Sequence, residues 1–291
     1  MISTKTRTKS DRPFRHATER ALDVLLLRGG VARLSYRLGA LGRVRVTRYT
    51  VTLAPGRQLP RPLTVGFASD FHAGPTTDPR LFDDLRAALE GERPDVLLLG
   101  GDYVSFDAAY VAALERFLRA ARAPLGTYAV IGNHDIWNGR AAVEAALAAA
   151  GIDVLVNRST TLPAPFDMVS VCGLDDPWTG QPSVPATFAG AGSEADRVRI
   201  FLTHSPDGVT LLDGQRYDAG FSGHTHGGQI ASPGGRPLFR PSGPASRDFS
   251  YGRYEIAGNG PLLVSCGVGC AGIPLRLNAD PELVICTLTP A

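Results

Sequence analysis

The chain has 291 residues, 44% of them hydrophobic, so it is long enough to bury the core of one large α/β domain or two small ones. The net charge of +2 conceals an asymmetry, because residues 1–48 hold twelve Lys/Arg against three Asp/Glu, and the remainder holds 18 against 25. The apolar run 21–27 contains Asp23 and stops at Arg28, which argues against a membrane-spanning helix and against a cleavable export signal.

The N-terminal segment is expected to be separate from the main domain. Residues 1–20 are polar and basic, and we expect the start of this stretch to be poorly ordered. From Val31 to Leu41 apolar residues recur at helical spacing with arginines between them, which predicts a short amphipathic basic helix. Two interpretations stay open: the helix packs on the domain, or it docks on an anionic membrane surface. We place the boundary between residues 1–43 and 44–291.

The rest of the chain predicts two β-sheets. Residues 44–53 alternate as a strand does, and strand-like runs at 63–69, 95–100, 125–132 and 152–157 then alternate with helical runs at 79–91, 108–122 and 139–151. Such alternation predicts a largely parallel sheet covered by helices. The second half holds strands at 167–174, 197–204, 217–224, 262–269 and 282–289 with less helix between them. We therefore expect an α/β protein with two packed mixed sheets flanked by helices.

Four cysteines, Cys172, Cys266, Cys270 and Cys286, lie in apolar runs, and their spacing matches no zinc motif. We expect buried free thiols in a protein of a reducing compartment. A long Gly/Pro/Arg-rich loop spans residues 234–254, and loops of this length are often functional. Its arginines either contact phosphate groups or anionic lipid heads or remain solvated; they are Arg236, Arg240, Arg247 and Arg253.

Polar residues follow five of the predicted strands, each at the carboxyl end. They are Asp70, His72, Asp102, Asn133, His134, Asp135, His204, His224 and His226. Ligands bind outside the carboxyl ends of the strands in open α/β sheets, so we expect these side chains to meet at one site. Five of the six histidines of the chain lie there. One buried histidine is usually structural, but five at strand ends indicate metal binding.

Carboxylate, amide oxygen and imidazole together suit Mn²⁺, Fe or Zn²⁺ better than Ca²⁺. The candidate ligands are Asp70, His72, Asp102, Asn133, His204, His224 and His226. Seven ligands exceed the needs of one ion, which indicates two ions that share a carboxylate. The neighbouring Asp175 and Asp176 either support a ligand histidine or make the turn before Pro177, and we favour the turn.

The motifs D70-F-H72, G101-D102, G132-N-H-D135, His204 and G223-H-T-H226 occur in the order found in the calcineurin-like metallophosphoesterases, and the chain resembles that family over residues 45–290. The GGQ that follows and the G-L-D-D-P-W at 173–178 are similar to a bacterial branch of secreted or membrane-associated phosphodiesterases. The resemblance implies a four-layer α/β/β/α sandwich in which 44–291 is the catalytic domain.

The resemblance also implies roles for individual residues. Asp70, His72 and His226 hold a first metal; Asn133, His204 and His224 hold a second; Asp102 bridges them. A metal-activated water attacks phosphorus directly, without a covalent enzyme intermediate. In this scheme His134 reaches the scissile phosphate and protonates the leaving oxygen, and Asp135 orients its imidazole; a loop cap is the alternative role of Asp135. Arg247 and Arg240 are candidate substrate-binding residues.

We expect a phosphohydrolase with two Mn, Fe or Zn ions, acting on a phosphate ester, with a phosphodiester of lipid or nucleotide type favoured. Alternatives are a non-catalytic metal-binding scaffold and a nuclease that uses the basic segment. The acidic main domain and the few aromatic residues of the basic segment argue against a stable nucleic-acid partner. We expect a cytoplasmic location, with peripheral contact to the inner face of the membrane and export as alternatives.

Overall fold

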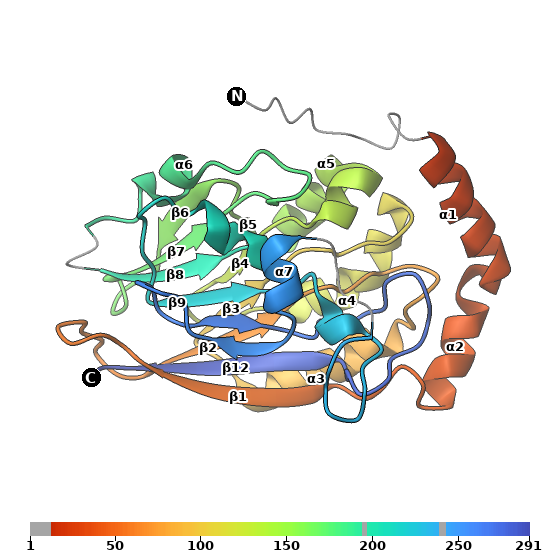
Figure 1. Cartoon of the computed structure of the whole chain (residues 1–291), viewed down its shortest axis with the longest axis horizontal. Helices are drawn as coiled ribbons and strands as arrows, with labels where there is room; N and C mark the ends of the chain where they lie inside the picture. The colour runs from red at the N-terminus through yellow and green to blue at the C-terminus, as the bar shows by residue number, and fades with distance from the viewer. Residues whose placement is uncertain (1–12, 194–196, 239–242) are drawn as a thin grey trace.

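The computed structural model describes residues 13–193, 197–238 and 243–291. Two six-stranded mixed sheets form its centre (Figure 1). The first has the order β1-β12-β2-β3-β4-β5 and contains β1 (Arg45–Thr52), β2 (Leu63–Ala68), β3 (Val96–Leu99), β4 (Thr127–Ala129), β5 (Asp153–Val154) and β12 (Glu282–Thr289). Its neighbouring strands are parallel except for β12 and β2, which are antiparallel.

The second sheet has the order β10-β11-β9-β8-β7-β6. It contains β6 (Arg158–Thr161), β7 (Val169–Gly173), β8 (Val198–Leu202), β9 (Ala219–Ser222), β10 (Gly252–Tyr254) and β11 (Leu262–Val264). The four central strands are parallel, and each edge strand is antiparallel to its neighbour. The predicted fold class of two mixed sheets is therefore confirmed. The edge strands β6 and β10 were not predicted, because both are short, partly exposed and polar.

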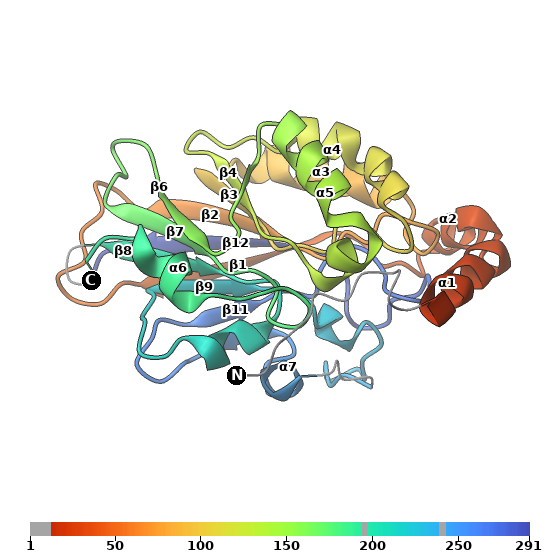
Figure 2. The same cartoon turned by 90° about the horizontal axis from the view of Figure 1, so that it is seen from above.

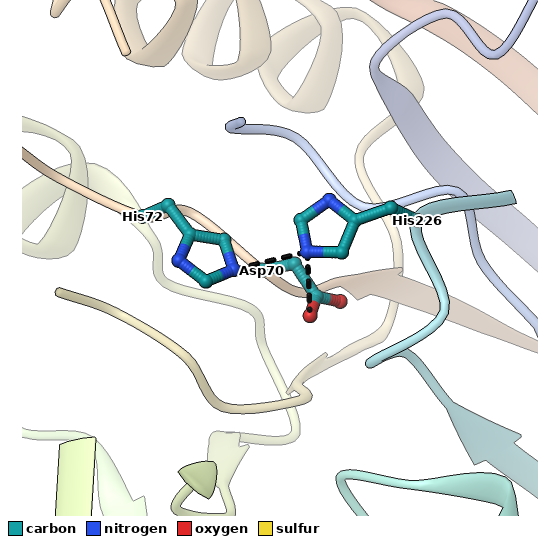
Figure 3. A group of neighbouring side chains, drawn as sticks. All are labelled: Asp70, His72 and His226. Carbon is teal, nitrogen blue, oxygen red and sulfur yellow. Dashed lines mark hydrogen bonds and ion pairs between the residues drawn. The ribbon is translucent and has the colours of Figure 1, made fainter. Parts of the chain in front are cut away.

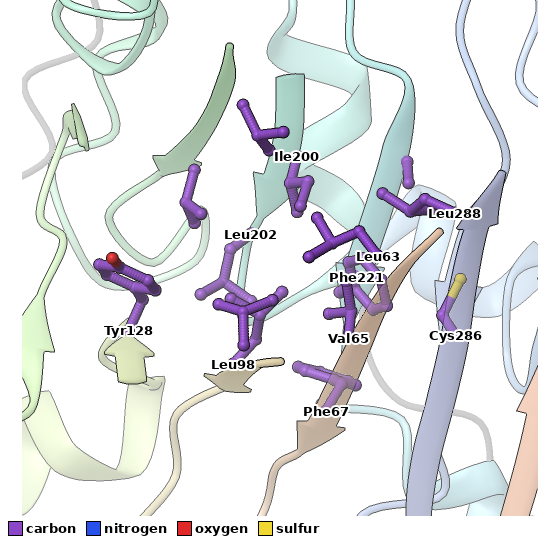
Figure 4. Packing of buried hydrophobic residues seen from close by; sticks show 14 of the residues in the cluster. Leu63, Val65, Phe67, Leu98, Tyr128, Ile200, Leu202, Phe221, Cys286 and Leu288 are labelled. Atoms are coloured by element: carbon purple, nitrogen blue, oxygen red, sulfur yellow. The ribbon is translucent and has the colours of Figure 1, made fainter. Parts of the chain in front are cut away.

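The inner faces of the two sheets pack against each other in the main hydrophobic core (Figure 4). Phe67 of β2 and Phe221 of β9 meet there with ring centroids 5.6 Å apart. Strand β3 shows how one sheet serves two cores, because Leu98 faces this core and Leu99 faces the helices on the other side. Alternation of side chains along a strand permits this double burial, which explains the unbroken apolar run of β3.

Helices cover the outer faces of both sheets. On the first sheet lie α3 (Arg80–Glu92), η3 (Ala108–Leu114), α4 (Glu115–Ala120) and α5 (Asn133–Ala149), and Figure 2 shows α3, α4 and α5 together on one side. On the second sheet lie α6 (Val184–Ala189) and η4 (Pro206–Leu211), with α7 (Pro244–Asp248) beside η4. The helix predicted at 108–122 divides into η3 and α4, and α5 begins six residues before the predicted start.

The N-terminal segment contains α1 (Pro13–Leu25), η2 (Leu27–Gly29) and α2 (Gly30–Arg37) at one end of the molecule (Figure 1). Helix α2 confirms the predicted amphipathic helix. Helix α1 was not expected, because its many polar residues conceal the apolar spacing; residues 1–12 lie outside the described part. Among the described residues, none of the helices is long and apolar enough to span a membrane. All four cysteines are free and buried, as predicted.

Candidate metal centre

The predicted ligands meet where the parallel strands of both sheets end. Asp70 and His72 follow β2, Asp102 follows β3, and Asn133 opens α5 just beyond β4. From the second sheet, His204 follows β8, and the turn with His224 and His226 follows β9, so the carboxyl ends of five strands deliver these residues. Because the strands in each sheet are parallel here, their carboxyl ends share one edge.

One group of donors consists of Asp70, His72 and His226, which point toward one another in Figure 3. Nε2 of His226 lies 3.0 Å from Nε2 of His72 and 3.5 Å from Oδ1 of Asp70. All three residues are buried. Their ligand atoms lie within 4.8 Å of one another, a spacing that one cation can bridge.

A second group consists of Asp102, His204 and His224, with Asn133 beside them. Nε2 of His204 lies 3.4 Å from Oδ2 of Asp102, 3.3 Å from Nδ1 of His224 and 3.1 Å from Oδ1 of Asn133. The same Oδ2 of Asp102 lies 3.5 Å from Nε2 of His72 in the first group. One carboxylate therefore connects the two groups.

The electrostatics of the cluster suit cation binding. Burial lowers the pKa of His72, His226 and His224, so these imidazoles are neutral and offer a lone pair. Burial opposes ionisation of Asp102, but nearby imidazoles, His204 first among them, outweigh it and hold the pKa of this carboxyl well below its usual value. In turn Asp102 raises the pKa of His204 against the effect of burial. The neutral imidazoles of His72, His224 and His226 beside the Asp102 carboxylate match the donor set of Mn, Fe or Zn, and His204 would release its proton to join them as a ligand.

Two of the candidate ligand histidines, His72 after β2 and His204 after β8, have a partner on the ring nitrogen that points away from the cluster. Nδ1 of His72 lies 2.6 Å from Oγ of Ser105, and Nδ1 of His204 lies 2.8 Å from the carbonyl oxygen of Gly100. A partner on the far nitrogen fixes the orientation of the ring and leaves Nε2 directed into the cluster. Sequence reasoning missed Ser105, because a serine outside the motifs carries no distinguishing signal.

The backbone of the cluster is strained. Five residues of the cluster have φ between 46° and 70°, in the left-handed region that residues other than glycine rarely adopt. They are Asp70, His72, Asp102, His224 and His226. Such strain concentrates at functional sites, where the surrounding structure holds it in place.

Two glycines let the loops of the centre approach one another. A Cβ at Gly132 would overlap the Asp102 carboxylate, and a Cβ at Gly223 would overlap the Asp70 carboxylate and the Ser69 hydroxyl. Both residues are therefore required by the crowding of the ligands rather than by φ, which lies outside the positive range at each.

Asp135 has contacts that differ from the expected one. One oxygen accepts hydrogen bonds from the backbone amides of Asp102 and Gly132, at 2.8 and 2.9 Å, and the other accepts from the amides of Tyr103 and Val104, at 2.8 and 3.2 Å. Four amides occupy the acceptor sites of the carboxylate. Asp135 therefore holds the Asp102 loop against α5, as a loop cap does, and its orientation of the His134 imidazole stays a prediction.

His134 lies beside the first group. Its ring centroid is 4.7 Å from that of His72 and 5.0 Å from that of Trp137, and its backbone amide donates to Oδ1 of Asp102 at 2.8 Å. Its ring nitrogen also comes within 4.8 Å of the donors of His72 and Asp102. Trp178 covers the other end of the centre, with its ring 5.5 Å from that of His224.

The remaining sequence expectations concern turns and arginines. Asp176 accepts from the backbone amides of Trp178 and Thr179, at 3.2 and 2.7 Å, which confirms the predicted turn. Arg247 is exposed on α7. Two residues beyond the end of this helix, the carbonyl oxygen of Ser250 accepts a 2.7 Å hydrogen bond from the Thr225 hydroxyl of the histidine turn. Arg240 lies outside the described residues.

Arg276 is a buried residue that sequence reasoning missed. It donates to the carbonyl oxygens of Gly269 and Ala279, at 3.0 and 2.7 Å, and its Nη2 lies 3.0 Å from the oxygen of Cys266 and 3.2 Å from Nδ1 of His226. It therefore ties three loop carbonyls together directly behind a candidate ligand. No spacing in the sequence distinguishes it from the other arginines.

Two packed mixed sheets that bring histidines, aspartates and an asparagine to their carboxyl ends define the class of metal-dependent phosphohydrolases. The family model for calcineurin-like phosphoesterase matches residues 63–228, and the chain belongs to this family.

Two relatives in sequence support the assignment. The chain is 31% identical over 231 residues to "Phosphodiesterase YaeI" of Escherichia coli, covering 78% of this chain and 82% of that protein. It is 31% identical over 200 residues to "Uncharacterized metallophosphoesterase YkuE" of Bacillus subtilis, covering 67% and 68%. A solved 5'-nucleotidase precursor from Thermus thermophilus is 15% identical with a TM-score of 0.46; the match covers 78% of this chain and 55% of that one, so the chain spans about half of its length.

Proposed function

We propose that the protein is a dinuclear metal-dependent phosphodiesterase. Asp70, His72 and His226 would hold one ion, and Asn133, His204 and His224 would hold the other, with the Asp102 carboxylate shared. The observation that carries the proposal is the position of Oδ2 of Asp102, which lies 3.5 Å from Nε2 of His72 and 3.4 Å from Nε2 of His204. One oxygen within reach of both groups is the arrangement that two ions sharing a carboxylate require.

Mn, Fe or Zn ions at these positions would polarise the phosphoryl group and lower the pKa of a water for in-line attack on phosphorus. The chain supplies the orientation: buried imidazoles with fixed rings, and a carboxylate held by the His134 amide at 2.8 Å. The relative named "Phosphodiesterase YaeI" supports a diester as the substrate.

His134 is the proposed proton donor to the leaving oxygen. It stands at the edge of the ligand cluster, packed between His72 and Trp137, and it is half-buried, so it can reach both the centre and a bound substrate. Arg247, three residues before the Ser250 carbonyl that contacts the histidine turn, and Arg240 are proposed to contact the phosphate or its substituents. Guanidinium groups suit this role because they donate two parallel hydrogen bonds to phosphate oxygens.

The test combines metal analysis with paired assays on one sample. The purified protein is analysed for bound metals and then assayed on a chromogenic phosphomonoester and a chromogenic phosphodiester, with Mn²⁺ added or chelated. We expect close to two ions per chain and diester cleavage that chelation abolishes. Asp102→Asn should lose both the second ion and activity, whereas Asp213→Asn, in a surface turn, should behave like the parent.

A metal-free protein that stays inactive when Mn²⁺ is added would overturn the proposal in favour of the non-catalytic scaffold. One ion per chain with full activity would overturn the dinuclear arrangement alone. Faster monoester cleavage would replace the substrate class while leaving the centre intact.

A further inference from the structure

Exposed apolar side chains concentrate at one end of the molecule. The described residues include twelve exposed large hydrophobic side chains, and six of them lie between residues 22 and 38, with three more between 273 and 277. The first six are Leu22, Val24, Leu25, Leu27, Leu34 and Leu38; the other three are Ile273, Leu275 and Leu277. Leu25 at the end of α1 and Leu38 just beyond α2 are 72% and 73% exposed, which is a high exposure for two leucines so close together. We call these nine residues the leucine face.

The two segments of the leucine face are joined to each other and to the main domain. The backbone amide of Arg276 donates to the carbonyl oxygen of Ala40 at 2.8 Å, just beyond α2. Leu41 is fully buried against Leu81 of α3 and Cys270, and the Tyr36 hydroxyl donates to Asp84 at 2.8 Å. The leucine face is therefore attached firmly to the sheets, and Figure 1 shows α1 and α2 beside the main body.

Basic residues lie among the apolar residues of this segment from Arg28 onward. Residues 21–43 contain four arginines and one acid, a net charge of +3, on a chain whose residues 49–291 carry 18 basic and 25 acidic side chains, or −7. The arginines are Arg28, Arg33, Arg37 and Arg43, and all four are exposed. The one acid, Asp23, accepts a 3.0 Å hydrogen bond from the Tyr110 hydroxyl of η3 and so faces the domain. The exposed side of these helices is thus basic and apolar together.

From this combination we propose that the leucine face docks on a membrane surface that contains anionic lipids. Leucines that alternate with arginines on short helices bury the apolar side chains at the acyl boundary while the long arginine side chains reach the head groups. The acidic remainder of the protein is repelled by the same surface, which orients the molecule. A second copy of the chain fits less well, because a symmetric contact would bring two +3 surfaces together.

The leucine face borders the metal centre from two directions. A Cβ on Gly29 would lie 3.9 Å from Cα of Pro75, which is three residues beyond His72. The backbone amide of Leu277 donates to the carbonyl oxygen of Gln229 at 3.0 Å, three residues beyond His226. Docking would therefore place the edge of the centre that His72 and His226 occupy next to the lipid head groups. This consequence rests on the proposed function, whereas docking itself does not.

The test measures binding of the full chain to sedimented vesicles of phosphatidylcholine, with or without about 30 mole per cent phosphatidylglycerol. We expect binding only to the anionic vesicles, weakened by salt, and reduced at least about tenfold in Leu25→Gln/Leu38→Gln. The matched control is Leu211→Gln, an exposed leucine on η4 that should leave binding unchanged. Hydrolysis of a soluble chromogenic diester serves as the check that each variant is folded, and all should match the parent.

Equal binding of the parent and Leu25→Gln/Leu38→Gln would overturn the proposal, as would failure of the parent to bind anionic vesicles. A dimer that this double variant abolishes, without vesicle binding, would assign the leucine face to a second copy. Vesicle binding by a protein that is inactive on every diester would contradict the proposed function and would still support membrane docking.

Discussion

Gly223→Ala tests whether the crowding at the metal centre is functional. The added methyl group would overlap the Asp70 carboxylate and the Ser69 hydroxyl, and it would lie 2.8 Å from Cβ of Ser69. Neither neighbour can move into solvent, because both are fully buried. The backbone cannot shift easily either, since the amide of Gly223 donates to His204 at 2.9 Å and the amide of His224 donates to Asp70 at 3.0 Å.

The size of the effect follows from the displacement. Restoring van der Waals contact moves the Asp70 carboxylate by about 1 Å, and overpacking of a dense interior costs about 1–3 kcal/mol. In a domain of this size each kcal/mol lowers Tm by about 2–4 °C, so we expect a fall of about 2–12 °C in the metal-free protein. Because Asp70 is a proposed ligand, metal affinity should fall about 10- to 100-fold.

The assay is isothermal titration with Mn²⁺ together with thermal unfolding of the chelated protein. Gly91→Ala is the matched control: Gly91 lies within α3, has no atom within 4 Å of its added methyl, and has no positive φ. Alanine there should stabilise the protein by up to about 1 kcal/mol and leave metal affinity unchanged. A Gly223→Ala protein with the metal affinity and Tm of the parent would refute the crowding argument.

Further predictions address the proton donor, the buried arginine and the thiols. His134→Asn should lower kcat on a diester about 10²- to 10⁴-fold with bound metal unchanged by elemental analysis, whereas loss of an ion would show that His134 is a ligand. Arg276→Met leaves three buried carbonyls without their donor and should lower the free energy of unfolding, measured in urea, by about 3–5 kcal/mol. The control is Arg119→Met, which breaks an exposed ion pair with Glu115 and should lower it by under about 1 kcal/mol. Burial raises the pKa of the Cys172 thiol to about 12. The thiol of the unfolded chain has its ordinary pKa of about 8.5 and loses its proton first as the pH rises, so the free energy of unfolding should fall above about pH 8.5. Ellman's reagent at pH 8 should label no cysteine until the protein unfolds. Rapid labelling of the native protein would contradict this burial.

The regular elements were predictable where one periodicity dominates. Strand β3 is buried on both faces, so its sequence is a continuous apolar run, and the equally buried β8 departs from this pattern only at Arg199. The edge strands β6 and β10 lack that signal, because they are half exposed and polar. Helix α5 is longer than predicted at its N-terminal end for another reason. Residues 133–138 already form its first turns, before the kink at Gly139 with φ of 137°. A glycine that kinks a helix is indistinguishable in sequence from one that starts it.

The candidate ligands were predictable because each follows a strand, whereas the residues that support them were not. Ser105 and Arg276 contact His72 and His226 from loops that are 33 and 50 residues distant in the chain. Such contacts depend on how the loops fold over the sheet edge, which no local pattern encodes. The amide donors of Asp135 were not predictable for a related reason: proximity in sequence suggested the neighbouring imidazole, whereas three amides of the Asp102 loop and the amide of Gly132 donate to its carboxylate.

The strain at the centre also bears on function. A left-handed conformation costs a residue other than glycine about 1–2 kcal/mol, so five such residues cost roughly 5–10 kcal/mol, which is comparable to the whole stability of a typical domain. The loops are held by backbone bonds between segments, such as Asp70 to Gly101 at 2.9 Å, His72 to Asp102 at 2.9 Å and Gly269 to Asp70 at 2.7 Å. Glycine at these positions would relieve the strain but would remove the ligands. The strain is therefore the consequence of placing side chains with lone pairs at positions where the backbone favours glycine, and the proposed binding of cations is a role that requires those lone pairs.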